Sequence, residues 1–368
     1  MDTLKTIPVA SPQMGDEEKK AVLDVLESGQ LAQGPVVEAF EREFAKWCGV
    51  EHAIAVNSGT AALHLLLLAH GFKEGDEIIT SAFTFVASAN AALFVGARPV
   101  FADIEKETYC LDPAKVEAAI TPRTKALMPV DLYGHPSQIE ELRAIADRHR
   151  ILLLEDACQA HGAAIGNRKA GAFGVDATFS FYPTKNMTTA EGGMVTTPDA
   201  DIAAKVSTLR QHGAAQRYHH DVLGYNFRLT DIAGAIGRAQ LAKLDRFNEI
   251  RRRHASVLDE GLAGTPGIVL PRERRGYRHV YHQYTIWVEG DRDRFQRRLR
   301  ELGIGTAVHY ELPVHRQPLY LGMGYDKVSL PVTEAASEHV LSLPVHPALS
   351  ESDLDRIVES VRKVASQE

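Results

Sequence analysis

The sequence predicts an α/β protein, with a large domain built on a mostly parallel seven-stranded sheet and a smaller C-terminal α/β domain. Three observations support this fold class. From residue 50 to about 200, short β-rich runs alternate with helical segments, which is typical of a parallel sheet covered by helices on both faces. A long helical stretch then runs from Leu229 to about Leu262, as often happens between two domains. From about residue 265, strands and helices alternate again in a shorter unit.

The elements follow in order along the chain. Two amphipathic helices, Gly15–Ser28 and Val36–Trp47, are separated by a turn-rich segment. The expected sheet strands are Ala53–Asn57, Glu77–Thr80, Pro99–Asp103, Ala126–Asp131, Ile151–Glu155, Ala177–Phe181 and Gly193–Thr196. The expected helices among and after them are Thr60–His70, Val86–Val95, Pro113–Ile120, Ser137–Arg148 and Ile202–Gln211.

The C-terminal unit is expected to comprise strands Tyr281–Val288 and Gly305–Tyr310 with helices Arg292–Leu302, Val332–Leu341 and Glu351–Val364. We therefore predict a large domain over residues 1–245, including the N-terminal helices, and a small domain over residues 246–368. A chain of 368 residues is long enough for both.

Charge and cysteine content narrow the function classes. A net charge of −7 and a pI near 6.2 argue against a general nucleic-acid or membrane-surface binder. A local basic cluster is interpreted as a solvated loop, with contact to a substrate phosphate as the alternative; it comprises Arg272, Arg274, Arg275 and Arg278. Three widely spaced cysteines suggest neither disulfides nor a zinc site, and the N-terminus lacks a signal pattern. We expect a soluble protein of the reducing cytoplasm.

One lysine and one aspartate carry the chemical prediction. Lys185 follows an apolar strand, among hydroxyl-bearing residues and glycines in S-F-Y-P-T-K-N-M-T-T-A-E-G-G-M-V. Desolvation there should lower its pKa and expose the lone pair that attacks an aldehyde. Asp156 ends the strand of Ile151–Glu155, where a carboxylate can pair with a pyridinium nitrogen. Alone, each is an ordinary loop lysine or helix cap; together they predict pyridoxal 5′-phosphate (PLP) chemistry.

Further residues could complete such a site. Gly59 and Thr60 lie between a strand and a helix, where N–H groups and the helix dipole favour a phosphate, although this is also ordinary helix-cap chemistry. Ser180, near the end of another strand, is a second candidate phosphate ligand. Phe85 can stack on a flat heterocycle or serve only as core, and the sequence does not decide between the two.

Several long motifs in the right order resemble the DegT-type (StrS-type) sugar aminotransferases of PLP fold type I. They include N-S-G-T-A-A-L-H-L, F-T-F-V-A-S-A-N-A, E-D-A-C-Q-A-H-G-A, the Lys185 motif and G-Y-N-F-R-L-T-D-I. The resemblance extends to Y-H-Q-Y-T-I, V-H-Y-E-L-P-V-H and L-S-L-P-V-H-P near the C-terminus, so it covers nearly the whole chain. It implies an aspartate aminotransferase-like large domain.

The resemblance also implies residue roles. Lys185 would form the Schiff base with the cofactor, Asp156 would pair with its ring nitrogen, and Gln159 would bind its phenolic oxygen. Phe85 would stack on the ring. The phosphate would be held by Gly59, Thr60 and Ser180, and by Asn226 from a neighbouring subunit, which implies a homodimer with shared active sites. His309 and Tyr310 would contact substrate.

Two positions depart from the family pattern. Asp131 stands where relatives usually carry His, which puts any specificity role there in question, and Ala190 replaces a common Gly. Lys185 is retained, whereas relatives that dehydrate sugars replace this lysine with His, which argues against a PLP-dependent dehydratase.

The implied activity is transfer of an amino group from L-glutamate (or glutamine) to a nucleotide-linked keto-deoxysugar, as in amino-sugar biosynthesis for polysaccharides or natural products. The alternatives are amination of a keto-cyclitol (an inosose) and a non-catalytic regulatory protein on the same fold.

Overall fold

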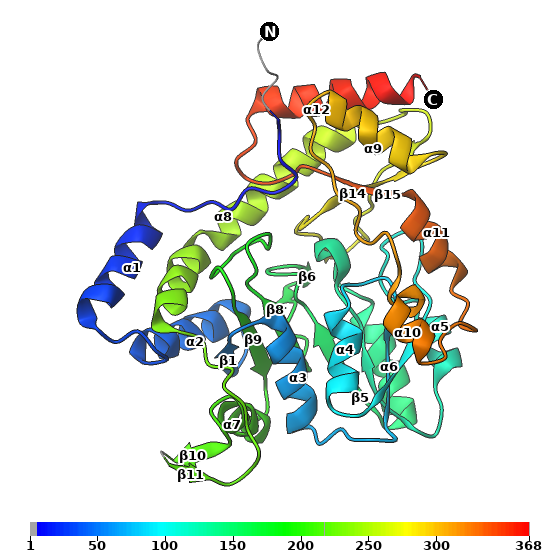
Figure 1. The fold of residues 1–368 in the computed structure, drawn as a ribbon. Helices are drawn as coiled ribbons and strands as arrows, with labels where there is room; N and C mark the ends of the chain where they lie inside the picture. Colours follow the sequence, from blue (N-terminus) through cyan, green and yellow to red (C-terminus); the bar gives the residue numbers. More distant parts are fainter. Residues whose placement is uncertain (1–5, 217, 368) are drawn as a thin grey trace.

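The computed structural model describes residues 6–216 and 218–367 and confirms the α/β fold class (Figure 1). Its centre is a seven-stranded sheet with the order β1-β9-β8-β5-β4-β2-β3. Its strands are β1 (His52–Val56), β2 (Glu77–Ser81), β3 (Arg98–Ala102), β4 (Thr124–Met128), β5 (Leu152–Asp156), β8 (Asp176–Ser180) and β9 (Gly193–Thr197). Only β9 of this sheet runs antiparallel to its neighbours, β1 and β8. All seven strands agree with the predicted ones to within a few residues.

Helices cover both faces of the sheet because its strands are apolar on both sides. One face packs against α3 (Gly59–Ala69), α4 (Ala87–Phe94) and α7 (Ala200–Leu209). The other packs against α2 (Pro35–Cys48), α5 (Pro113–Ala119) and α6 (Ile139–His149). On this second face Phe44 of α2 meets Phe179 of β8 edge-on, with ring centroids 5.1 Å apart. Helix α1 (Asp16–Ser28) packs against α8 (Asp231–Leu262).

Helix α8 runs from the large sheet to the C-terminal unit, as Figure 1 shows. Leu241 and Leu244 belong to the core beneath the large sheet, whereas Ala255, Leu258 and Leu262 belong to the core of the C-terminal unit. The predicted division between residues 245 and 246 falls inside this helix and stays a prediction.

The C-terminal unit contains a sheet of β12 (Ile268–Val269), β14 (Tyr284–Val288) and β15 (Val340–Leu343), covered by α9 (Arg292–Glu301) and α12 (Glu351–Ala365). The remaining short elements are β6 (Ala164–Ile165), β7 (Arg168–Lys169), β10 (Ala214–Gln216), β11 (His219–His220), β13 (Tyr277–Arg278), α10 (Pro318–Gly322), α11 (Pro331–His339) and the 3₁₀ turns η1 (Leu132–Gly134) and η2 (Val314–Arg316).

The predicted strand at Gly305–Tyr310 is wrong. The N-terminal segment occupies the neighbouring backbone, because Ile7 N donates to Gly303 O at 2.9 Å and Gly305 N donates to Ile7 O at 2.7 Å. Only Ala307 makes an isolated bridge, to Ser342. The strand that pairs with β14 is instead β15, which begins inside the predicted helix Val332–Leu341.

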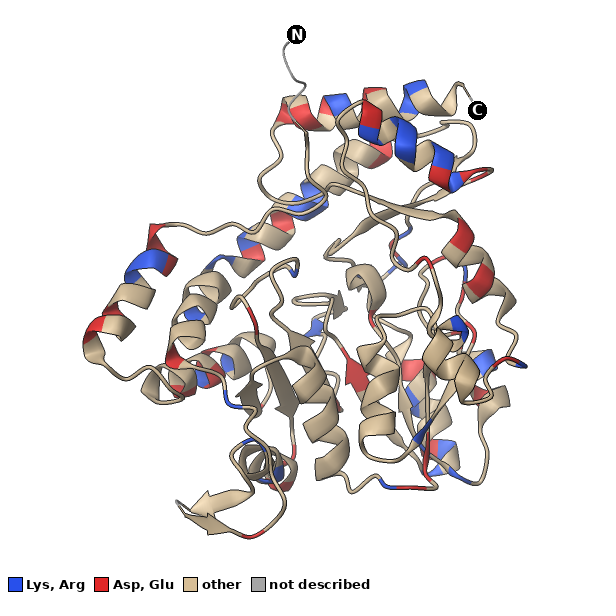
Figure 2. Cartoon of the chain, in the orientation of Figure 1, with Lys and Arg blue, Asp and Glu red and all other residues tan. Residues whose placement is uncertain are grey.

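Charged residues of both signs are interspersed over the surface helices (Figure 2). The predicted basic cluster is largely neutralised: Arg272 pairs with Glu107 at 3.0 Å, Arg274 with Glu105 at 2.8 Å, and Arg278 with Glu249. These ion pairs favour its interpretation as a solvated surface. Within the described ranges, no helix combines the length and apolarity needed to cross a membrane, and no group of three or more His, Cys, Asp or Glu is arranged to hold a metal ion.

Candidate active site

The start of α3 forms a cradle at the edge of the sheet. Ser58 caps this helix, because its hydroxyl accepts a hydrogen bond from Ala61 N at 3.1 Å. A β-carbon at Gly59 would lie 2.7 Å from Ser180 Cβ, and one at Gly193 would lie 2.4 Å from Ser58 O, so both glycines allow close backbone approach. The first N–H groups of α3, from Gly59 and Thr60, lack intrahelical acceptors and favour an anion.

Asp156 ends β5 and is 2% exposed. Ser88 of α4 donates its hydroxyl proton to Asp156 Oδ2 at 2.7 Å, and Cys158 N donates to Asp156 Oδ1 at 3.2 Å. These donors fix the orientation of the carboxylate and stabilise its charge. Ser88 was not among the predicted site residues, since only the packing of α4 on the sheet brings it to β5.

Lys185 lies in the loop after β8, and its backbone N–H donates to Tyr182 O at 2.9 Å. The side chain is half-buried. Burial lowers the pKa of its amine, and electrostatic interactions with Cys158 and Asp156 partly oppose that shift. The sequence-based expectation of a lowered pKa is therefore confirmed in direction. The interaction with Asp156 indicates that the amine and the carboxylate are close enough to influence each other.

Gln159 connects the sheet to the C-terminal unit. Its Oε1 accepts from Tyr133 N at 2.9 Å, and its Nε2 donates to the Tyr310 hydroxyl at 3.2 Å. The hydroxyl of Tyr133 in turn donates to the backbone carbonyl of His309. Tyr133 is a second residue that the sequence did not single out, and it holds both the amide and the 305–310 segment in place.

His309 and Phe85 lie near Lys185 and Tyr310, respectively. Burial, together with the positive charge of Lys185, lowers the pKa of His309 to about 4, so this imidazole is neutral near pH 7. Phe85 is 56% exposed, and its ring centroid lies 6.5 Å from that of Tyr310. Such exposure rules out the interpretation of Phe85 as a core residue.

Asn226 lies beside the turn that precedes α3, where Asn57 Nδ2 donates to Asn226 O at 3.5 Å. Its side chain is exposed. The expected contact from a neighbouring subunit involves a second chain and stays a prediction.

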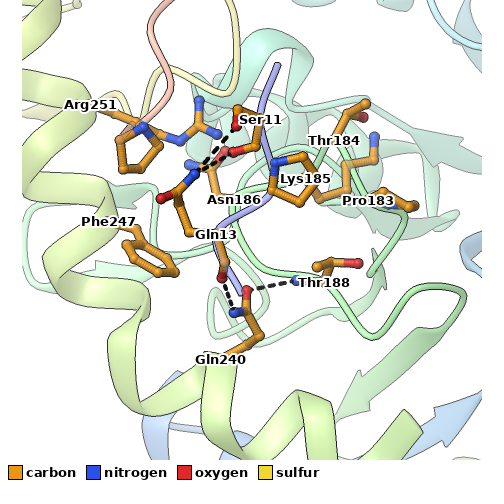
Figure 3. A pocket seen from close by; sticks show the side chains of 12 residues that line it. Ser11, Gln13, Pro183, Thr184, Lys185, Asn186, Thr188, Gln240, Phe247 and Arg251 are labelled. Carbon is orange, nitrogen blue, oxygen red and sulfur yellow. Dashed lines mark hydrogen bonds between the residues drawn. The ribbon is translucent and has the colours of Figure 1, made fainter. Parts of the chain in front are cut away.

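A pocket behind the Lys185 loop lies between the N-terminal segment and α8 (Figure 3). Gln240 of α8 connects the N-terminal segment to the Lys185 loop, because its Nε2 donates to Gln13 O at 2.7 Å and its Oε1 accepts from Thr188 N at 3.4 Å. Asn186 anchors the loop further by donating to Asn248 Oδ1 at 2.8 Å and to Val280 O at 3.0 Å. The backbone around Lys185 is therefore held on several sides.

The model of the DegT/DnrJ/EryC1/StrS aminotransferase family matches residues 12–362. The chain belongs to this family. It is an aminotransferase, and its cofactor is PLP. The residues described above fit that cofactor, because a helix N-terminus with no side chain in the way, a buried carboxylate and an amine of lowered pKa meet at one sheet edge.

Similar proteins span almost the full length. A dTDP-3-amino-3,4,6-trideoxy-alpha-D-glucose transaminase of Streptomyces venezuelae is 42% identical over 98% of this chain and 95% of its own. A "pleiotropic regulatory protein" of Geobacillus stearothermophilus is also 42% identical, over 95% of this chain and 94% of its own. The crystal structure of S. venezuelae DesV in complex with a ketimine intermediate superposes with a TM-score of 0.93 at 43% identity, covering 95% of this chain and 94% of that one.

Proposed function

We propose that this aminotransferase moves an amino group from L-glutamate (or glutamine) to the keto group of a nucleotide-linked keto-deoxysugar. The site chemistry that supports it is the meeting of the Lys185 amine, whose pKa burial lowers, with the Asp156 carboxylate that Ser88 and Cys158 hold in place. The acceptor class is supported by the full-length similarity to the S. venezuelae transaminase, whose name specifies a dTDP-linked amino sugar.

We assign the cofactor contacts residue by residue. Lys185 would hold the aldehyde, Asp156 the ring nitrogen and Gln159 the phenolic oxygen, with Phe85 stacked on the ring. The N–H groups of Gly59 and Thr60 and the hydroxyl groups of Thr60 and Ser180 would bind the phosphate. His309 and Tyr310 would contact the substrates.

When bound, PLP supplies an electron sink for the negative charge left on the donor's α-carbon. The side chains of the protein supply the proton transfer and the charges around the cofactor. Once released from the aldehyde, the Lys185 amine, kept neutral more readily because it is partly desolvated, would take the α-proton as general base and return it as general acid. Asp156 would keep the ring nitrogen protonated through a charge-assisted hydrogen bond. Neutral His309 presents a polar group without adding positive charge beside Lys185.

We also propose a homodimer with shared active sites, in which the exposed Asn226 reaches the cofactor phosphate of the other subunit. The exposure of its side chain and its place next to the α3 turn support this assignment.

The test is the absorption spectrum of the purified protein with PLP, before and after L-glutamate. We expect a visible band from the lysine-bound cofactor that gives way to the band of its aminated form. Lys185→Ala should show neither the first band nor amino transfer. Lys169→Ala, which removes a half-buried lysine that lies over the Trp47 ring and outside the proposed site, is the matched control and should behave as the parent. A wild-type band that glutamate leaves unchanged would refute the donor; an active Lys185→Ala enzyme would refute the catalytic assignment.

Amination of an inosose would use the same residues, so keto-sugars and keto-cyclitols belong in one acceptor screen. The name of the G. stearothermophilus relative raises the regulatory alternative. That alternative predicts a colourless protein that takes up no PLP, and the same spectrum decides it.

A further inference from the structure

The strand that carries Asp156 also carries a second carboxyl group, which meets a third. Glu155 and Asp131 are both fully buried, at 0% exposure. Successive side chains of a strand point to opposite faces, so Glu155 lies on the other face of the sheet from Asp156. Asp131 is tied to the same strand, because its backbone N–H donates to Asp156 O at 3.0 Å. None of the roles proposed above uses the Glu155–Asp131 pair.

The hydrogen-bond partners of the pair leave one oxygen on each residue unaccounted for. Asp131 Oδ1 accepts from Ser137 N at 2.8 Å, and Glu155 Oε2 accepts from Gly171 N at 2.9 Å. Asp131 Oδ2 and Glu155 Oε1 are buried without a donor among the described residues. Val130 bridges Asp156 on the neighbouring strand, so Asp131 and Glu155 lie diagonally opposite each other on one face of the sheet, where their carboxyl groups are within reach of each other. Because carboxylate oxygens only accept, a hydrogen bond between the two groups requires a shared proton.

The surroundings offer no positive charge to balance two carboxylates. In the described part of the chain, no Lys, Arg or His forms an ion pair or hydrogen bond with either group. The titratable side chains whose charge acts on the pair are Asp156 on the opposite face of the sheet, Cys110 beside Asp131, and Cys48 beside Glu155. Burial raises the pKa of both carboxyl groups, and their mutual repulsion raises that of Glu155 further. Two touching buried carboxylates cannot both ionise.

We propose that Glu155 is held protonated, that it donates a hydrogen bond to the Asp131 carboxylate, and that this shared proton makes the pair a positioning element for the active site. The proton resides on Glu155, because burial and the nearby Asp131 carboxylate raise its pKa well above the ordinary value, whereas the pKa of Asp131 rises only to about 6. This bond fastens β5 to the segment that contains Tyr133, whose N–H holds Gln159 and whose hydroxyl holds the His309 backbone. The positioning role rests on the proposed function; the shared proton does not.

The shared proton can be tested on the full-length protein, with and without PLP, by infrared spectroscopy. A buried protonated carboxyl group gives a C=O band that shifts in D₂O. We expect this band in the wild type and its loss in Glu155→Gln. Glu77→Gln is the matched control, since Glu77 is 3% exposed but is an ionised partner of Arg123, and it should leave the band unchanged. Absence of the band in the wild type, or its persistence in Glu155→Gln, would overturn the proposal whatever reaction the protein catalyses.

The positioning role is tested by comparing two substitutions. The carboxamide of Glu155→Gln keeps a donor for Asp131 and an acceptor for Gly171 N, so PLP affinity should stay within about 2-fold of the wild type. Glu155→Ala leaves Asp131 without its donor, and PLP affinity should fall by about 5-fold or more. If Glu155→Ala does not fold, Glu155→Gln still tests the positioning role. A large loss of PLP affinity in that isosteric variant would contradict it.

Discussion

A β-carbon built on Gly59 would lie 2.7 Å from the β-carbon of Ser180, closer than two such atoms approach in real structures. The start of α3 therefore packs directly on the end of β8, and the two proposed phosphate-binding elements form one surface. Only glycine permits this approach, so residue 59 offers a direct test of the cradle.

We expect Gly59→Ala to weaken PLP binding by about tenfold or more. The added methyl group must push α3 away from Ser180, and overpacking of this kind costs about 1–3 kcal/mol. A titration of the apoprotein with PLP, followed by fluorescence, gives the affinity. Gly322→Ala is the control, because a β-carbon there meets nothing within 4 Å. Equal affinities for the two variants would argue against the cradle.

Ser88→Ala should slow the half-reaction with glutamate by roughly tenfold. The substitution removes the 2.7 Å hydrogen bond to Asp156 Oδ2, and a hydrogen bond to a charged group contributes about 1.5–3 kcal/mol. Single-turnover kinetics monitored by absorbance measure the effect. Thr84→Ser, which keeps the hydroxyl that contacts Ser88, should react at nearly the parent rate. A Ser88→Ala rate equal to the parent would show that Cys158 N alone suffices to hold Asp156.

Stability should fall as the pH drops from about 6.5 to about 4. Burial lowers the pKa of His135 to about 4 and that of His161 to about 3, from an ordinary value of 6.5. Over that interval the unfolded chain binds protons that the folded chain does not, so acid favours unfolding, and the full contribution is present above pH 6.5. Each buried histidine accounts for at most about 3–5 kcal/mol. Urea denaturation at several pH values in this interval measures how steeply the free energy of unfolding changes with pH. His135→Asn should reduce this slope, and an unchanged slope would show that His135 does not contribute to it.

Replacing Ala190 with glycine should stabilise the folded protein. Its φ of +69° lies in the left-handed region, where a β-carbon costs about 1 kcal/mol. We expect Ala190→Gly to raise the free energy of unfolding by up to about that amount, measured in urea. The same change at the exposed helical Ala204 should lower it by about 0.5–1 kcal/mol. Destabilisation at both positions would contradict the strain at residue 190.

Shared active sites can be tested by mixing two inactive variants. A Lys185→Ala chain retains Asn226, and an Asn226→Asp chain retains Lys185, so a hybrid dimer contains one intact site. The negative charge of Asn226→Asp should repel the cofactor phosphate and abolish binding in the homodimer. We expect activity to reappear when the two variants are unfolded and refolded together. No recovery, with hybrid dimers shown to form, would place Asn226 outside the partner's site.

The sequence by itself determined the large sheet, the helices around it, the position of Asp156 at a strand end and that of Lys185 shortly after another strand. These are local properties: an apolar run of strand length and the polar residues that end it can be recognised without knowing the neighbours. The family motifs added Gln159 and Tyr310, whose hydrogen bond the structure contains.

The tertiary structure alone decided which side chains meet. Ser88 reaches Asp156 only because α4 packs beside β5. The expected strand at Gly305–Tyr310 is absent because Ile7, almost 300 residues earlier, accepts the backbone hydrogen bond of its first residue. Glu155 and Asp131 likewise look like two ordinary acidic residues in the sequence. Their contact, and the proton it requires, follow from the folded path of the strands, because a side chain's partner depends on distance in space and not on spacing along the chain.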